Sequence, residues 1–176
     1  MQAMAGDTTI LVLGLGNRLL GDDAAGPLVV DRMAGGVADA YTPVRWRDGG
    51  TMGLALLPEI EGASALIAVD AARFGAEPGT VRVFEGAAMD AQLRGRHHSA
   101  HELALGDLMG AAALSGCLPE HRALVAVEPQ STSLSLAPSA PVAEALPRLC
   151  HEVQRLIERW RARHGHAAHN RQESDA

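Results

Sequence analysis

Three short apolar runs, separated by stretches with helical spacing, constrain the fold of this 176-residue chain more than any other feature. The runs are TTILVLGLG at 8–16, ALIAVDA at 65–71 and ALVAVE at 123–128. Continuous apolar runs of this length are typical of strands that are covered on both faces, as in parallel sheets. They predict the centre of a sheet with helices on both sides.

Two further runs alternate apolar and polar residues, a pattern typical of strands near the edge of a sheet. They are TPVRWRD at 42–48 and TVRVFE at 80–85. Apolar residues at helical spacing predict helices at 27–34, 53–61, 101–115 and 142–160. Strands that alternate with helices predict an α/β fold, a single domain with three layers, α/β/α, around a five-stranded, mostly parallel sheet.

One connection departs from the parallel pattern. Residues 72–79, ARFGAEPG, are too few and too rich in turn residues to form the helix of a parallel crossover. The fourth strand is therefore predicted to be antiparallel. The α/β domain is expected over residues 1–163, and the polar segment 164–176, which loses apolar periodicity, is expected to be a flexible tail.

Composition excludes several classes of partner. The net charge is −6, and there is no long basic run to bind the phosphates of a nucleic acid. Only 3% of the residues are aromatic, which leaves few rings on which bases could stack. No apolar run approaches the roughly 20 residues of a membrane-spanning helix. The N-terminus has no secretory pattern, and Cys117 and Cys150 form no C-x-x-C pair. We expect a cytoplasmic protein that binds no membrane and works as a monomer.

Acidic residues follow the predicted strands at the edge where open α/β sheets bind ligands. Asp22 and Asp23 come after the first strand, Asp48 after the second, and Asp70 ends the third. A single acid at a strand end is more often structural than functional. Their shared placement at one edge makes this edge the candidate site.

The adjacent pair of acids needs a particular explanation. Pro27 is best accommodated in the first turn of a helix, so a helix is expected to begin around 24–26. One carboxylate would then cap free N–H groups at the helix N-terminus. The second remains unexplained, because adjacent carboxylates repel each other unless a cation or separate partners compensate. A metal ion is one such cation.

His101 supplies a third candidate ligand. The spacing in S-A-H-E is that of a capping box, which places His101 in the first turn of a helix. The helix dipole there disfavours imidazolium, so the ring keeps a lone pair for a metal. Two carboxylates and one imidazole form an open site for Zn²⁺, Ni²⁺ or Cu²⁺. No G-x-S-x-G elbow is present, so hydrolysis would need water and a metal.

The sequence resembles the hydrogenase maturation endopeptidases, which trim the C-terminus of the precursor of the nickel–iron hydrogenase large subunit. The resemblance covers nearly the whole chain and rests on GLGNRLLGDDAAGP, DGGTMG, VDAARFGAEPGTV and SAHELALGDLMG. It implies a metal site made by Asp23, Asp70 and His101. It implies for Asp48 a structural or substrate-positioning role near the cleft. Ala24 stands where the family usually has glycine, which predicts some strain in the backbone.

The resemblance also implies the substrate and the metal. The partner would be the large-subunit precursor, with nickel recognised in that substrate and other divalent metals able to occupy the site. The metal could polarise the scissile carbonyl or lower the pKa of a bound water to roughly 7. The three ligands could instead hold the precursor's nickel as a recognition handle. The sequence identifies no general base.

Two other functions use the same features. A docking chaperone that recognises nickel in the precursor without cutting it would need the same ligands. A peptidyl-tRNA hydrolase also begins with GLGN after its first strand, but the negative charge and Arg18, where that family has proline, disfavour it. A dinucleotide site would require glycine in place of Leu19.

Overall fold

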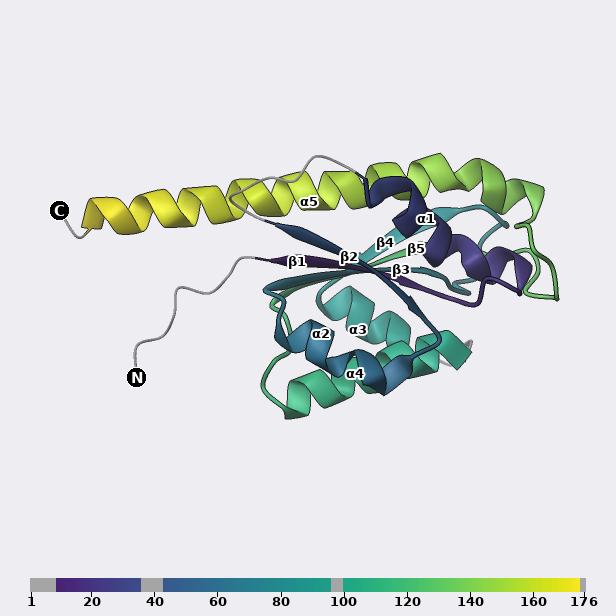
Figure 1. Cartoon of the computed structure of the whole chain (residues 1–176), viewed down its shortest axis with the longest axis horizontal. Helices are drawn as coiled ribbons and strands as arrows, with labels where there is room; N and C mark the ends of the chain where they lie inside the picture. Colours follow the sequence, from purple (N-terminus) through teal and green to yellow (C-terminus); the bar gives the residue numbers. More distant parts are fainter. Residues whose placement is uncertain (1–8, 36–42, 96–99, 175–176) are drawn as a thin grey trace.

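A five-stranded sheet forms the centre of the molecule (Figure 1), and the computed structural model describes residues 9–35, 43–95 and 100–174. For residues 100–102 and 164–174 only the backbone is described. The strand order is β2-β1-β3-β5-β4. The strands are β1 Ile10–Leu15, β2 Val44–Gly50, β3 Ala65–Ala71, β4 Val81–Glu85 and β5 His121–Val127.

The pairing of the strands confirms the predicted topology. β4 runs antiparallel to β5, and the other neighbours are parallel. The three apolar runs form the central strands, and every residue of β3 is buried. The two alternating runs, β2 and β4, lie at the edges, where one face of a strand meets solvent.

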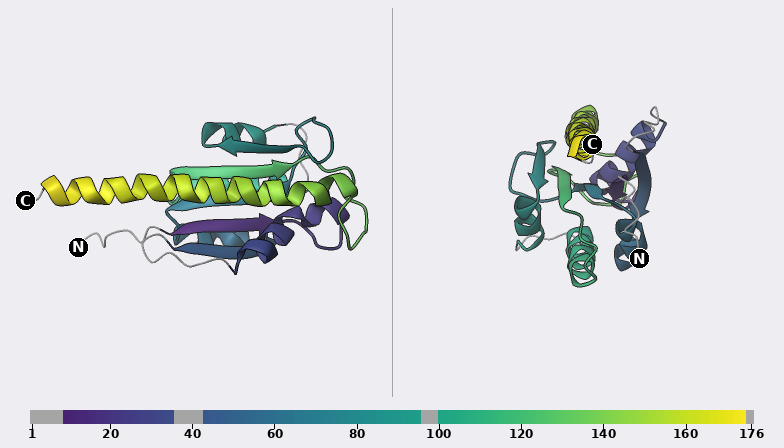
Figure 2. Two further views of the ribbon diagram at one scale, coloured as in Figure 1. Left: turned by 90° about the horizontal axis from the view of Figure 1, so that it is seen from above. Right: turned by 90° about the vertical axis from the view of Figure 1, so that its left-hand side faces the viewer.

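Helices cover both faces of the sheet. They are α1 Ala25–Met33, α2 Leu57–Glu61, α3 Ala87–Leu93, α4 Ala100–Leu114 and α5 Ala140–Ser174, with 3₁₀ turns η1 Gly21–Ala24 and η2 Gly53–Leu56. α1 and α5 lie on one face, and α2, α3 and α4 on the other (Figures 1 and 2), which confirms the three layers. No helix in the described part of the chain is both long and apolar enough to span a bilayer.

The strands divide the core in two because successive side chains point to opposite faces. Ile67 of β3 packs in the cluster with Trp160 of α5, whereas its neighbour Leu66 packs in the cluster with Leu108 of α4. All four side chains are almost completely buried. Burying a side chain of this kind stabilises the fold by about 1.5–3 kcal/mol.

Two helical segments differ from the sequence prediction. α3 was not predicted, because its apolar signal is a single pair spaced by four residues, Met89 and Leu93. α5 continues to Ser174, beyond Trp160, where the apolar spacing that predicted this helix ends. The backbone there is helical, and the flexibility of residues 164–176 stays a prediction.

Glycines allow α1 to approach the sheet closely. A Cβ added at Gly26 would lie closer than 3.0 Å to the backbone of Val69 and Leu15, and one at Gly14 equally close to the backbone of Gly26. The start of α1 therefore rests directly on β1 and β3. This contact places η1, which carries the pair of acids, over the carboxyl ends of the central strands.

Candidate functional site

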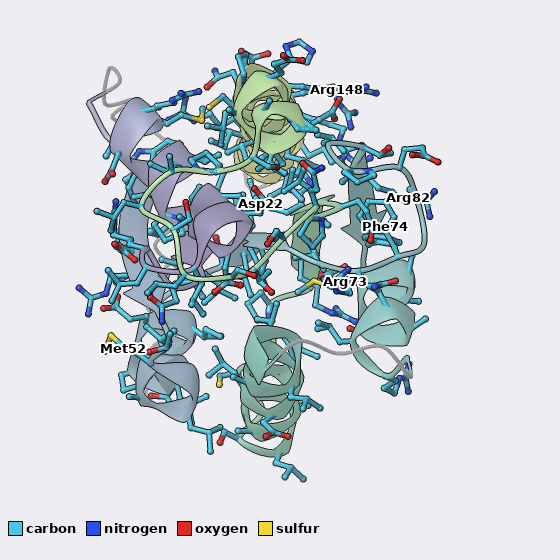
Figure 3. The ribbon with its side chains drawn as sticks, turned by 90° about the vertical axis from the view of Figure 1, so that its right-hand side faces the viewer. Asp22, Met52, Arg73, Phe74, Arg82 and Arg148 are labelled. Carbon is cyan, nitrogen blue, oxygen red and sulfur yellow. The ribbon has the colours of Figure 1, made fainter. Side chains whose placement is uncertain are left out.

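Asp23 and Asp70 lie buried at the carboxyl edge of the sheet, the edge that faces the viewer in Figure 3. Asp23 belongs to η1 and Asp70 to β3, and η1 packs against β3. The backbone N–H of Asn17 donates to Asp23 Oδ2 at 2.7 Å, which fixes that carboxylate. Two carboxylates buried in adjoining elements are the oxygen donors that a divalent cation binds. The donor set therefore fits a metal.

His101 is the second residue of α4, so the predicted position in the first helical turn is confirmed. Its imidazole lies outside the described side chains. Among the side chains that are described, no three His, Cys, Asp or Glu residues form a metal-binding group. The three-ligand site of Asp23, Asp70 and His101 therefore stays a prediction.

Asp22 has a different role from its neighbour. Its fully buried carboxylate accepts hydrogen bonds from the backbone N–H groups of Gln130, Ser131 and Ser139 at 2.6–2.8 Å, and from the Ser139 hydroxyl at 2.9 Å. Burial raises the pKa of the Asp22 carboxyl, but these hydrogen bonds from Ser131, Ser139 and Gln130 lower it more, so the pKa lies below its ordinary value. Asp22 anchors the connection between β5 and α5.

The helix-capping interpretation of the acidic pair is wrong. Neither η1 nor α1 has a side-chain hydrogen bond at its N-terminal cap. The separate partners that two adjacent acids require are instead found along the chain, at Asn17 for Asp23 and at 130–139 for Asp22. The strain expected at Ala24 is also absent, because its φ is −75°.

Asp48, at the end of β2, is held by an arginine. Arg18 Nη2 donates to Asp48 Oδ2 at 2.8 Å and Nη1 donates to Asp31 Oδ2 at 2.7 Å. Asp48 Oδ1 also accepts a hydrogen bond from the backbone N–H of Gly50 at 3.0 Å. Arg18 thus ties β2 to α1 beside the loop that follows β1. These contacts fit a structural role for Asp48, and a direct contribution to the chemistry stays a prediction.

Glu128, which the sequence analysis did not single out, is a second buried anchor. Its Oε2 accepts hydrogen bonds from the backbone N–H groups of Phe74 at 2.8 Å and Ala76 at 3.2 Å. Its own backbone bonds to Gly79 and Thr80. The sequence pattern that could have indicated Glu128 is its position as an acid directly after an apolar strand. Glu128 fixes the segment 72–80 that connects β3 to β4 at the site.

Comparison with known proteins gives the family of the chain. A family profile described as hydrogenase maturation protease matches residues 29–156. The chain belongs to the hydrogenase maturation protease family. The hydrogenase expression/formation protein HupD of Rhodobacter capsulatus is 39% identical over 120 residues, which cover 68% of this chain and 57% of that protein. The chain thus spans less than three fifths of the length of this relative.

A sequence match and a structural match from Escherichia coli agree with this assignment. The hydrogenase 2 maturation protease is 34% identical over 125 residues, covering 69% of this chain and 74% of that protein. The structure of the hydrogenase maturating endopeptidase HybD superposes with a TM-score of 0.79 at 28% identity. That superposition covers 86% of this chain and 93% of HybD. The resemblance that the motifs indicated is therefore confirmed at the level of family and fold.

Proposed function

We propose that the chain is a metal-dependent endopeptidase that removes a C-terminal extension from the nickel-loaded precursor of a nickel–iron hydrogenase large subunit. The observation that carries the proposal is the burial of Asp23 and Asp70 in adjoining elements at the strand ends. His101 lies in the first turn of α4. Family membership supplies the reaction class.

The proposed chemistry assigns a role to each residue of the edge. Asp23 and Asp70, with His101, would hold the metal, which supplies a Lewis acid for the scissile carbonyl or for a water. The Asn17 N–H keeps Asp23 oriented, and Asp22 keeps the 128–139 segment closed over the same edge. The same ligand set would recognise nickel that the precursor already holds.

Exposed leucines beside the acids support a protein substrate. Leu134 and Leu136 are 82% and 85% exposed, and Leu19 is 53% exposed. The two loops are joined, since the N–H of Ser135 donates to the carbonyl of Leu19 at 2.9 Å. Apolar side chains that remain exposed next to a polar site are typical of surfaces that bind another protein.

The experiment that tests the proposal follows the mass of the precursor. Purified protein is incubated with nickel-loaded and nickel-free large-subunit precursor, and the C-terminus is followed by intact mass spectrometry. Mass loss from the loaded precursor alone supports a nickel-dependent endopeptidase. Binding without mass loss would favour the docking chaperone and overturn the proposed cleavage.

Alanine variants assign the site in the same assay. Asp23→Ala, Asp70→Ala and His101→Ala should each reduce processing at least a hundredfold, because each removes a metal ligand. The matched controls are Asp107→Ala and His151→Ala, which remove exposed side chains of the same kinds on α4 and α5. The controls should process normally. Full activity of all three site variants would contradict the metal assignment.

A further inference from the structure

Two arginines and a phenylalanine lie next to the acids at the strand ends. We call Arg73, Phe74 and Arg82 the arginine platform. Arg73 follows β3 three residues after Asp70, and Arg82 lies in β4. Figure 3 shows all three on the β4 side of the strand ends.

The strand register places Arg82 and Asp70 in one row across the sheet. Ala126 of β5 pairs with Asp70 on one side and with Arg82 on the other. Two strand spacings separate the Cα atoms of Asp70 and Arg82 by about 10 Å. Leu66 lies four residues before Asp70 in β3, and Phe84 lies two residues after Arg82 in β4. Both belong to the core beneath α3 and α4. Asp70 and Arg82 therefore point to the same face of the sheet, with Ala126 between them in the row.

Two members of the platform, Arg82 and Phe74, are held in place by contacts to rigid elements. The guanidinium carbon of Arg82 lies 4.7 Å from the centroid of the Phe74 ring, and that ring meets Phe84 edge-on at 5.8 Å. The Phe74 N–H is fixed by buried Glu128. A guanidinium stacked on a ring keeps its in-plane N–H donors available, and these donors match a carboxylate. The platform is thus prepared for a negatively charged ligand.

Arg73 and Arg82 differ from several of the other described arginines in their charge partners. Among the residues that the structure describes, the arginines that pair with acids include Arg18, Arg45, Arg47, Arg122, Arg155 and Arg159. Within the described part of the chain, Arg73 and Arg82 form no ion pair, and both are exposed. In a chain of net charge −6, two such cations beside the site provide a local attraction for acidic groups.

We propose that the arginine platform binds acidic side chains of the precursor segment that carries the cleavage site. The inference rests on the proposed function and names the chemistry of its substrate. Two guanidinium groups on separate residues suit a segment with more than one carboxylate, since a bidentate pair uses one carboxylate for each arginine. The platform selects the substrate, and the metal site acts on it.

The kinetic test uses the nickel-loaded precursor and substitutions that remove charge. Arg73→Gln combined with Arg82→Gln should raise KM about tenfold, equivalent to about 1.4 kcal/mol of binding, and leave kcat within about twofold. Arg32→Gln is the matched control, because Arg32 is exposed on α1 and forms no ion pair with described residues. Its KM should not change. An unchanged KM in the double variant would overturn the proposal.

A second arm changes the substrate. Replacing the Asp and Glu residues around the precursor's cleavage site by Asn and Gln should raise KM for the wild type about tenfold but not for the double variant. Equal increases for both proteins would contradict direct contact. If blocking the precursor's terminal carboxylate alone raises KM as much, the platform binds that carboxylate, and the assignment of its ligands to acidic side chains is wrong.

The inference and the proposed function fail in distinguishable ways. Absence of cleavage by the wild type would contradict the proposed function. Biolayer interferometry measures the affinity of the immobilised wild type and of the immobilised double variant for the nickel-loaded precursor. This affinity tests the platform independently of cleavage. Equal affinities would then overturn the inference. Urea unfolding of each variant checks that the substitutions leave the fold intact.

Discussion

At the residue scale, two adjacent and chemically identical acids have different partners. The sequence predicts that Asp22 and Asp23 need separate compensation, because neighbouring carboxylates repel. The sequence does not predict which groups compensate each carboxylate, because the hydrogen-bond donors to Asp22 lie at 130–139, more than a hundred residues away along the chain. Strand ends indicate Asp22, Asp23, Asp48 and Asp70 alike, and only the family resemblance distinguishes Asp23 as a ligand. The anchoring roles of Asp22 and Glu128 depend on tertiary contacts.

Asp22→Asn tests the anchoring role. The amide cannot replace a carboxylate that accepts three backbone N–H bonds and one hydroxyl bond. The substitution should lower the free energy of unfolding by about 3 kcal/mol, measured by urea denaturation. Glu77→Gln, which neutralises an exposed acid, should change it by less than about 0.5 kcal/mol. Similar values for both variants would show that the Asp22 hydrogen bonds contribute little.

The lowered pKa of Asp22 also predicts a pH dependence. The pKa in the folded chain lies below the ordinary value of 3.8, so the stabilisation is complete above about pH 4 and is lost as the pH falls through the folded-state pKa. Asp31 and Asp90, whose pKa values are lowered by Arg18 and Arg122, contribute in the same direction. In urea denaturation from pH 5 to pH 2, the stability gap between wild type and Asp22→Asn should narrow. A constant gap would contradict the assignment.

At the element scale, the sequence predicts the strands better than the short helices. The central strands are visible as continuous apolar runs because both faces of each are covered. The antiparallel β4 follows from the length of the connection 72–79, which cannot hold a crossover helix. The sequence does not predict α3, because a single apolar pair, Met89 and Leu93, does not establish a helical repeat that would distinguish a helix from a loop.

Gly26→Ala tests the contact that positions η1. The added Cβ would overlap the backbone of β1 and β3, so α1 must move outward. We expect a loss of about 1–3 kcal/mol in the free energy of unfolding and weaker metal binding, because Asp23 moves with α1. Gly110→Ala, in α4, adds a Cβ that meets no described atom within 4 Å apart from its chain neighbours and the backbone of its own helix, so it should be neutral or stabilising by up to about 1 kcal/mol. Urea denaturation and metal titration calorimetry compare the two variants.

At the scale of the whole molecule, α5 links the site to the far end of the sheet. It begins beside the 128–139 segment that Asp22 holds, and its apolar side crosses the sheet to Trp160, which stacks on His121 at 5.8 Å. From there the helix extends past the sheet (Figure 2). The apolar spacing that ends at Trp160 predicted the packed part of this helix, but helix continuation in a polar segment leaves no such signal.

Removal of residues 164–176 separates the packed helix from its extension. Trp160 is the last buried residue among the described side chains of α5, so the shortened chain should keep its free energy of unfolding within about 1 kcal/mol of the full chain. Urea denaturation measures this difference. Hydrogen exchange of the full chain then reports the segment itself, since rapid exchange throughout 164–174 is expected of a flexible tail. Slow exchange there, with a stability loss above about 2 kcal/mol on truncation, would place the segment within the folded domain.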